Sequence, residues 1–290
     1  MVNNGVNKSE FLNSYGKDIF LDGAMGTMLQ KHGLKSGEMP DLMNMTAPET
    51  VEKIHKMYVE AGSDIICTNT FGSNADLLKD SGYTVSEVIT EAVKIAKRAS
   101  ANTNTKVALD IGPTGQLLEP YGDLEVEDAY DMFKEMAVAG ERAGADLAVV
   151  ETMSELSELE AAITAVRDNT KLPIFATMTF DKNGRTYMGV SVEDFIALAE
   201  RLGTTAIGLN CSLEPSEMLE TVKRFTEITK LPVIVKPNAG LPDKADGSYH
   251  TGAEMFAEQM KDIMDLGVRI VGGCCGTAPE YIRELRKNNV

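Results

Sequence analysis

Three cysteines that follow apolar segments are the residues most able to do chemistry in this 290-residue chain. Cys211 ends the segment AIGLNC, and Cys274 and Cys275 stand side by side in VGGCCGT. The adjacent pair makes a poor disulfide, because consecutive Cα atoms lie about 3.8 Å apart and ordinary disulfides need about 4.4 to 6.8 Å. Three thiolates with an open fourth position match a catalytic zinc site. We therefore expect Cys211, Cys274 and Cys275 to bind zinc and to form the catalytic centre.

Both members of the adjacent pair can reach one metal only if the chain bends, because side chains on a regular strand alternate between its two faces. We expect Gly272, Gly273 and Gly276 to allow this bend by adopting backbone angles closed to other residues. The alternative is that the cysteines only fill buried space, as free cysteine often does. For Cys67, inside the apolar run DIICTN, we prefer that alternative: it fills the core or packs behind the site.

A rhythm of short apolar strand, loop and amphipathic helix recurs eight times along the chain. The predicted strands are 19–26, 64–72, 107–115, 147–153, 173–180, 206–212, 232–240 and 269–277. Eight such units without a linker predict one domain of the α/β class, a (β/α)8 TIM barrel over residues 1–290 with 1–17 as an N-terminal extension. The main rival is a doubly wound open sheet, which more often shows GxGxxG after its first strand; DGAMGT does not match that pattern.

Two of the helical segments carry specific signals. Segment 47–62 places Val51, Ile54, Tyr58 and Val59 on one face, with Gly62 as a stop. In SVEDFIALAERLG, Ser191 and Asp194 resemble a capping box with Asp in place of Glu.

Polar and sulfur-bearing side chains gather at the predicted carboxyl ends of the strands, where barrel enzymes place their active sites. They are Asp22, Asn69, Asp110, Glu151, Cys211, Asn238, Cys274 and Cys275. Turn geometry explains Asn69, Asp110 and Asn238 at least as readily as function does. His32, His55 and His250 lie away from strand ends, so we expect surface or capping histidines and no histidine-based metal site.

The formal net charge of −16 disfavours nucleic acid and anionic membrane surfaces as partners. A small neutral or zwitterionic substrate fits this charge better. The N-terminal residues lack the apolar run of a signal peptide, and no segment approaches the roughly 20 apolar residues of a membrane span. We expect a cytoplasmic protein, in which four cysteines indicate metal binding or catalysis more than disulfides.

Six segments resemble the homocysteine S-methyltransferase family, in chain order and over nearly the whole length. They are LDGAMGT at 21–27, TNTF at 68–71, ET at 151–152, GLNC at 208–211, PNAGLP at 237–242 and GGCCGT at 272–277. The pattern is most similar to the N-terminal homocysteine-binding domain of cobalamin-dependent methionine synthase. The resemblance implies a (β/α)8 barrel in which three cysteines bind zinc and hold homocysteine as a thiolate that attacks a methyl group, giving methionine.

The resemblance also implies that Asp22 and Glu151 bind the homocysteine amino group. Backbone N–H groups of Ala24, Met25, Gly26 and Thr27 offer a place for its carboxylate. Asn69 and Asn238 complete the expected substrate-binding set.

The methyl donor implied by PNAGLP and GGCCGT is methylcobalamin, carried by a separate corrinoid protein or by a cobalamin domain of a longer chain. Alternative donors are S-methylmethionine and betaine. Two further alternatives are a corrinoid-protein methyltransferase that acts on another acceptor and a barrel that only stores zinc or binds a partner. The last is disfavoured, because it gives Asp22 and Glu151 no reason to share a mouth with a metal.

Overall fold

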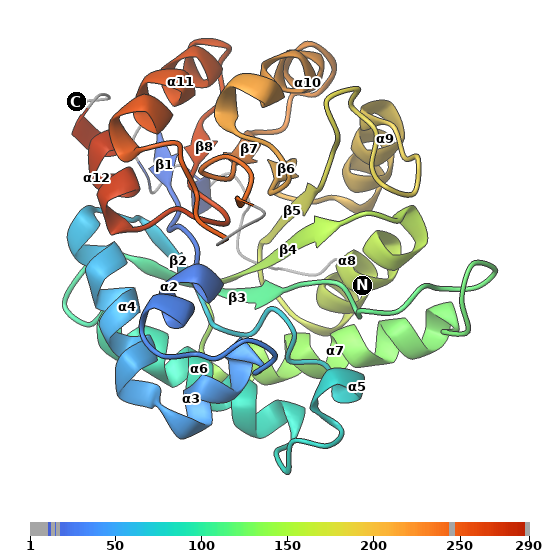
Figure 1. Ribbon diagram of the computed structural model, residues 1–290. Helices are drawn as coiled ribbons and strands as arrows, with labels where there is room; N and C mark the ends of the chain where they lie inside the picture. Colours follow the sequence, from blue (N-terminus) through green and yellow to red (C-terminus); the bar gives the residue numbers. More distant parts are fainter. Residues whose placement is uncertain (1–10, 13–14, 16–17, 244–246, 288–290) are drawn as a thin grey trace.

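Eight parallel strands form a barrel with helices on its outside (Figure 1) in a computed structural model that describes residues 11–12, 15, 18–243 and 247–287. The strand order is β1-β8-β7-β6-β5-β4-β3-β2, and every pairing is parallel. A parallel bridge between Leu21 and Ile65 joins the first strand to the second and closes the ring. The predicted (β/α)8 TIM barrel is confirmed.

All eight predicted strands are present. They are β1 (Ile19–Phe20), β2 (Ile65–Cys67), β3 (Lys106–Ile111), β4 (Leu147–Met153), β5 (Ile174–Met178), β6 (Ala206–Asn210), β7 (Val233–Lys236) and β8 (Ile270–Val271). Most end earlier than the sequence predicted. The glycine, asparagine and proline residues that close each predicted segment lie in loops, which carry most of the expected site residues around the barrel mouth.

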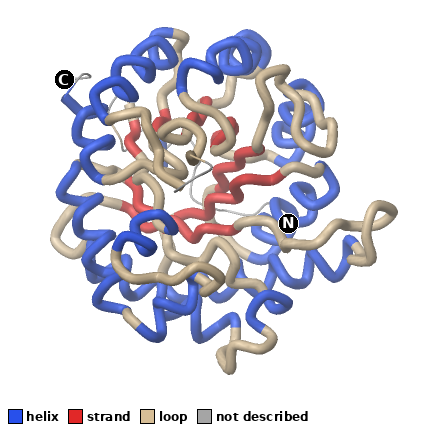
Figure 2. The backbone as a smooth tube through the Cα atoms, in the orientation of Figure 1, coloured by secondary structure: helices blue, strands red, loops and turns tan. Residues whose placement is uncertain are grey.

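The helices form a ring outside the strands, coloured blue around the red strands in Figure 2. They are α2 (Gly26–Lys31), η1 (Pro40–Leu42, a 3₁₀ turn), α3 (Met43–Thr46), α4 (Pro48–Ala61), α5 (Ala75–Leu78), α6 (Val85–Ala99), α7 (Val126–Ala143), α8 (Leu156–Asn169), α9 (Val192–Leu202), α10 (Pro215–Ile228), α11 (Ala253–Asp265) and α12 (Pro279–Lys287). Within the described residues, no helix is long and apolar enough to cross a membrane.

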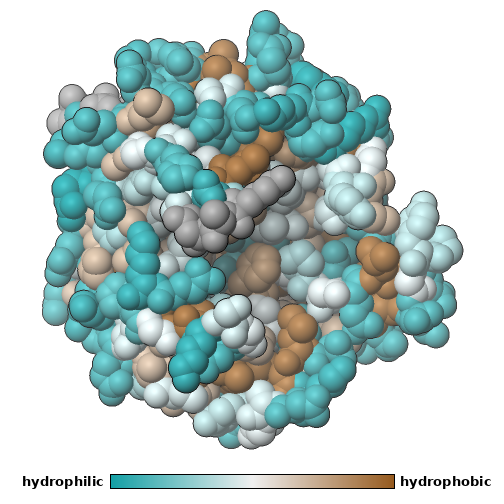
Figure 3. Space-filling model, viewed as in Figure 1, coloured by the Kyte–Doolittle hydropathy of each residue, from teal (hydrophilic) through white to brown (hydrophobic). Residues whose placement is uncertain are grey.

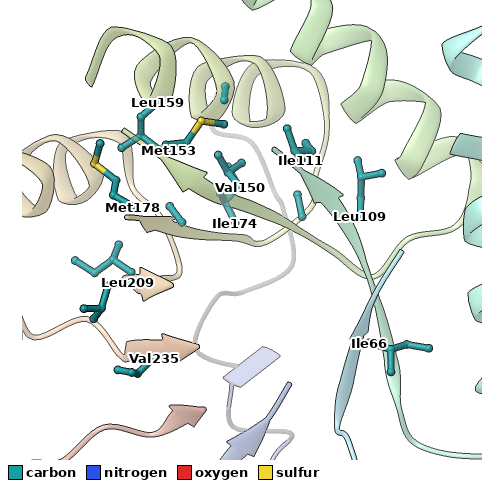
Figure 4. Close-up of a cluster of buried hydrophobic side chains, with 14 of the residues drawn as sticks. Ile66, Leu109, Ile111, Val150, Met153, Leu159, Ile174, Met178, Leu209 and Val235 are labelled. Carbon is teal, nitrogen blue, oxygen red and sulfur yellow. The ribbon is translucent and has the colours of Figure 1, made fainter. Parts of the chain in front are cut away.

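Two apolar clusters follow from the alternation of side chains along each strand. The outward-facing set packs against the helices and includes Ile66, Leu109 and Val150 (Figure 4). The inward-facing set fills the barrel itself and includes Leu21 and Ile65. A barrel of eight strands is just narrow enough for side chains to fill it.

Phe11 belongs to the inward-facing cluster, where its ring meets Phe175 edge-on at 6.1 Å between centroids. Part of the predicted extension 1–17 therefore packs into the barrel core. The remaining residues of that extension, 1–10, 13–14 and 16–17, lie outside the described part of the chain.

Helix α4 confirms the predicted segment 47–62 and corrects one expectation about it. Val51, Ile54 and Tyr58 are buried, and Gly62 ends the helix in the left-handed conformation. The prediction that His55 is a surface or capping residue was wrong, because its side chain is fully buried. Position 55 follows Val51 by four residues and so lies on the same helix face.

The other helix-terminal expectations agree with the structure. Ser191 caps α9 by accepting a hydrogen bond from the N–H of Asp194. His32 lies at the end of α2, with Nδ1 2.9 Å from the carbonyl oxygen of Met28, and His250 is exposed.

Candidate active site and metal centre

The three predicted zinc ligands converge at the barrel mouth. The Sγ atoms of Cys211, Cys274 and Cys275 all lie within 4.8 Å of one another, and those of Cys211 and Cys275 are 4.0 Å apart. The three thiols are half-buried, whereas Cys67 is buried in the inward-facing core as predicted. Cys211 lies 63 positions before Cys274 in the sequence, yet it joins the adjacent pair in one sulfur cluster, because β6 and β8 end at the same mouth.

Main-chain hydrogen bonds to the β7 strand and loop fix the cysteines in place. The N–H of Cys211 donates to the carbonyl of Lys236, and that of Cys274 donates to Pro237. The carbonyl of Cys275 accepts from the N–H of Ala239. Cys211 itself has φ 64°, a left-handed conformation that costs a non-glycine residue roughly 1 to 3 kcal/mol and is found mostly at functional sites.

The glycines around the cysteine pair act differently from our expectation. Only Gly276 has a positive φ, of 82°; Gly272 and Gly273 do not. Those two are needed for space instead: a Cβ at Gly273 would lie 2.3 Å from Oγ1 of Thr277, and one at Gly272 would lie 2.8 Å from the carbonyl of Asp22. The predicted bend is present, but close packing explains two of its three glycines: against Asp22 for Gly272, and within the loop itself for Gly273.

The three thiols perturb one another strongly. Cys274 and Cys275 donate hydrogen bonds to the sulfur of Cys211 and lower the pKa of that thiol. The same cluster raises the pKa of Cys274 and Cys275, because a second thiolate beside the first is unfavourable. Tyr249 also hydrogen-bonds to Cys275.

This donor set fits zinc. Tetrahedral coordination with Zn–S bonds of about 2.3 Å requires sulfur atoms about 3.8 Å apart, close to the 4.0 Å between Cys211 and Cys275. In the part of the chain that the structure describes, no fourth His, Cys, Asp or Glu joins the three thiols, which leaves one coordination position open, as in catalytic zinc sites. Asn210 lies behind the cluster with Nδ2 3.9 Å from Sγ of Cys274.

Four buried charged side chains lie at the same barrel mouth as the sulfur cluster. Asp22, Asp110 and Glu151 come from the ends of β1, β3 and β4, and Lys236 ends β7. Nζ of Lys236 is 2.5 Å from Oε2 of Glu151, and both side chains are more than nine-tenths buried. We call these four residues the acidic floor.

Among the described residues, Lys236 forms its ion pair with Glu151, and the other two carboxylates of the acidic floor have no ion pair of their own. Oδ2 of Asp22 accepts a hydrogen bond from the N–H of Cys67 at 2.7 Å, but Oδ1 of Asp22 and Oδ1 of Asp110 are buried without a partner. Burial raises the pKa of Asp22 to about 7, and burial and Glu151 raise that of Asp110 well above its usual value. Unpartnered buried carboxylates of this kind favour a bound cation.

The predicted carboxylate-binding loop lies against the cysteine loop. The N–H of Ala24 donates to Oγ1 of Thr277, and the hydroxyl of Tyr58 donates to the carbonyl of Ala24. The amide of Ala24 is therefore already used. Gly26 and Thr27, as the first residues of α2, have amides without an intrahelical acceptor, and Met25 precedes them as the N-cap.

The two asparagines of the expected substrate set have different surroundings. Nδ2 of Asn69 donates to the carbonyl of Pro40, which ties the end of β2 to η1. Asn238 hydrogen-bonds to the sulfur of Cys211, and its own Oδ1 is buried without a partner. Asn69 thus supports a loop, and Asn238 lies at the sulfur cluster; their contact with a substrate stays a prediction.

Sequence reasoning missed three residues of the site. Lys236 has a sequence signal, since a lysine closes the apolar strand PVIVK. Asn210 lies in the segment GLNC, but the sequence assigned it no role. Its Oδ1 accepts a hydrogen bond from the N–H of Thr152, the residue that follows Glu151, and so fixes the backbone beside that carboxylate. Tyr249 has no local signal, because only the folded β7–α11 loop brings it to Cys275.

The fold and the site together define the class: a (β/α)8 barrel that can hold a metal ion on three thiolates at its mouth, with buried carboxylates at the same mouth. Comparison with known families gives the assignment within that class. The homocysteine S-methyltransferase family model matches residues 19–289, so the chain belongs to this family of methyltransferases.

Individual relatives agree with the assignment. The chain is 34% identical over 287 residues to the methionine synthases of Mycobacterium leprae and Mycobacterium tuberculosis, with 91% of this chain and 24% of each relative covered. It thus spans about a quarter of the length of these curated relatives. Its fold matches the homocysteine methyltransferase MmuM from Escherichia coli, with TM-scores of 0.82 for the oxidised and 0.81 for the metallated form at 23% identity; 98% and 97% of this chain and all of that chain are covered.

Proposed function

We propose that the chain is a zinc-dependent homocysteine methyltransferase that accepts its methyl group from methylcobalamin on a corrinoid protein or domain. The observation that carries the proposal is three half-buried thiols at the same barrel mouth as an acidic floor with unpartnered oxygens, joined by the hydrogen bond from the N–H of Gly273 to the carbonyl of Asp22. The thiols would hold a metal, and the floor would hold the ammonium of an amino-acid thiol.

Each part of the site has a role in this reaction. Cys211, Cys274 and Cys275 would hold the zinc, which when bound supplies a charge that keeps the substrate sulfur as a nucleophilic thiolate at neutral pH. The acidic floor, through Asp22 and Glu151, would bind the ammonium and so orient the sulfur. The new S–C bond forms as the bond from the methyl group to its donor breaks, and the electron pair of the broken bond stays with the donor.

The surface around the mouth supports a macromolecular donor. Exposed large apolar side chains lie in loops that follow strands or in the first turn of the next helix: Phe71, Leu77, Tyr83, Leu117, Tyr121, Val126, Tyr187, Leu241 and Met255. We call this set the apolar rim. Figure 3 shows brown surface at several places around the central hollow of this face. Exposed apolar groups gathered on one face are typical of a protein-binding surface.

The donor is tested by incubating the zinc-loaded protein and homocysteine with each candidate and measuring methionine. We expect slow turnover with free methylcobalamin, because positioning by a carrier can supply roughly 7 to 11 kcal/mol of the barrier. A cognate methyl-corrinoid protein should accelerate the reaction greatly. Rapid methionine formation from S-methylmethionine or betaine, with none from methylcobalamin, would reject the corrinoid donor and leave the zinc-thiolate chemistry in place.

The acceptor is tested by replacing homocysteine with other thiols. A thiol without an amino group, 4-mercaptobutanoate, should react poorly because the acidic floor then has no ammonium to bind. Equal turnover of this analogue would favour the alternative in which the barrel serves a different acceptor.

A further inference from the structure

Lys236 raises a question that the proposed reaction does not answer. Its ammonium group is bonded to Glu151, the carboxylate that the family resemblance assigns to the substrate ammonium. A buried ion pair is rarely retained for stability alone, since well-packed apolar side chains stabilise a core as well or better. A lysine in the barrel interior, 2.5 Å from a substrate-binding carboxylate, therefore points to a role in binding.

The acidic floor contains more carboxylate oxygens than the ammonium group of Lys236 can bind. Lys236 holds Oε2 of Glu151, while Oδ1 of Asp22 and Oδ1 of Asp110 stay buried and unpartnered. These carboxylates lie close enough to Lys236 that all three raise its pKa, against the effect of burial. Its flexible four-carbon stem gives the ammonium group several positions among them.

We propose that Lys236 is a built-in substitute for the substrate ammonium: it occupies Glu151 in the empty site and moves to Asp110 when homocysteine binds. The inference rests on the proposed function, because it assumes that the incoming ligand is an amino-acid thiol. The substrate ammonium then lies between Glu151 and Asp22. Both cations have a carboxylate partner after the exchange, so no buried ammonium group is left alone at either stage.

Through this exchange, Lys236 lowers the affinity of the site for the amino group of homocysteine. Homocysteine must displace one ammonium from Glu151 to bind, which lowers its apparent affinity in the way that any required rearrangement does. Removing the charge in Lys236→Met should therefore tighten homocysteine binding, by about 10-fold. If Lys236 only orients Glu151, the variant should change affinity in the opposite direction. The Glu151 carboxylate would then lose its fixed position, and homocysteine would bind more weakly.

Titration calorimetry of the zinc-loaded protein gives the first test. We expect tighter homocysteine binding in Lys236→Met, no such gain when Glu151→Gln is also present, and no effect of Lys236→Met on 4-mercaptobutanoate, which has no ammonium. Lys236→Gln keeps a hydrogen-bond donor for Glu151 and repeats the test if the methionine variant folds poorly. Lys230→Met, an exposed lysine just before β7, is the matched control.

A structure of the zinc-loaded wild-type protein with homocysteine gives the second test and needs no variant. We expect Nζ of Lys236 at Asp110 and the substrate ammonium at Glu151. An intact Lys236–Glu151 pair beside bound homocysteine, or weaker binding by Lys236→Met, would overturn the exchange while the proposed function stands. Failure of every form of the protein to bind homocysteine would instead reject the proposed function.

Discussion

Cys274 and Cys275 supply two of the three sulfur atoms in the candidate metal centre, and neither side chain belongs to the apolar core. We predict that the purified protein holds about one zinc per chain through sulfur ligands. The double variant Cys274→Ala, Cys275→Ala should lose tight zinc binding and keep its far-ultraviolet circular dichroism, because the pair lies in a loop after β8.

Cys67→Ala is the matched control for that variant, since it removes a thiol from the inward-facing core and none from the mouth. It should keep its zinc. Metal analysis of both variants, with X-ray absorption of the wild type, checks the prediction. Full zinc content in the double variant, or nitrogen-rich coordination, would contradict it.

His55 gives a prediction about stability and pH. Burial lowers its pKa to about 4, from 6.5, and neither ring nitrogen has a hydrogen-bond partner. The folded protein keeps this imidazole neutral, whereas the unfolded chain binds a proton below pH 6.5. The unfolded state therefore gains protons as the pH falls from about 6.5 to 4, and the folded state loses up to roughly 3 kcal/mol of stability across that window.

The variant His55→Leu should lack this loss. As the pH falls from 7 to 4, we expect the free energy of unfolding of the variant to rise relative to that of the wild type. Urea denaturation at several pH values measures the difference and cancels the contributions of the carboxylates, which both proteins share. A pH-independent difference would show that His55 finds a proton acceptor in the folded state.

At the scale of the elements, the loop after β7 packs against the loop after β8, which carries two of the three cysteines. The two loops are in close contact at Gly276: its φ is 82°, and a Cβ there would lie 2.2 Å from the ring of Tyr249. We predict that Gly276→Ala pushes Tyr249 and the β7–α11 loop away from Cys275 and weakens zinc binding roughly 10-fold or more, the scale of changes behind a metal ligand.

Gly267→Ala separates crowding from backbone strain. Gly267 has φ 94°, but a Cβ there would meet nothing within 4 Å. This control should lose about 1 to 2 kcal/mol of stability and no zinc affinity. Competition titrations with a zinc chelator compare the two variants, and equal zinc affinities would refute the steric account of Gly276.

At the scale of the whole molecule, the apolar rim lies on one end of the barrel. Among the described residues, Ile228 is the exposed large apolar side chain outside it, at the far end of α10. We predict that Tyr187→Ser combined with Leu241→Gln lowers the rate of methyl transfer from a corrinoid protein, because the docking surface loses apolar area. Zinc content and homocysteine affinity should not change.

Ile228→Gln is the control, because it removes an exposed apolar side chain on the opposite end of the barrel. Methyl-transfer rates at several concentrations of the corrinoid protein measure the effect, and free methylcobalamin provides the reference reaction. An equal decrease in both variants, or a decrease with free methylcobalamin as well, would contradict a docking role for the rim.

Most of the fold could be predicted because its signals are local. Apolar runs such as AIGLN and VIVK identify strands by themselves, and the 3.6-residue spacing of Val51, Ile54 and Tyr58 identifies the buried face of α4. The same spacing includes His55, so that correction was available in the sequence. Strand ends were less predictable, since a strand stops where its neighbour stops pairing, and this depends on residues far away in the chain.

The sequence by itself determined the eight-unit order, the zinc-ligand candidates and the three acids at strand ends, since repetition and residue type can be recognised without coordinates. Only the tertiary structure decided what those groups meet. The three thiols come within 4.8 Å of one another, and Lys236 reaches Glu151, because parallel strands bring their carboxyl ends to one mouth. The reason for Gly272 is likewise a contact with a loop distant in sequence, at Asp22, which no local pattern encodes; Gly273 is crowded by Thr277 within its own loop.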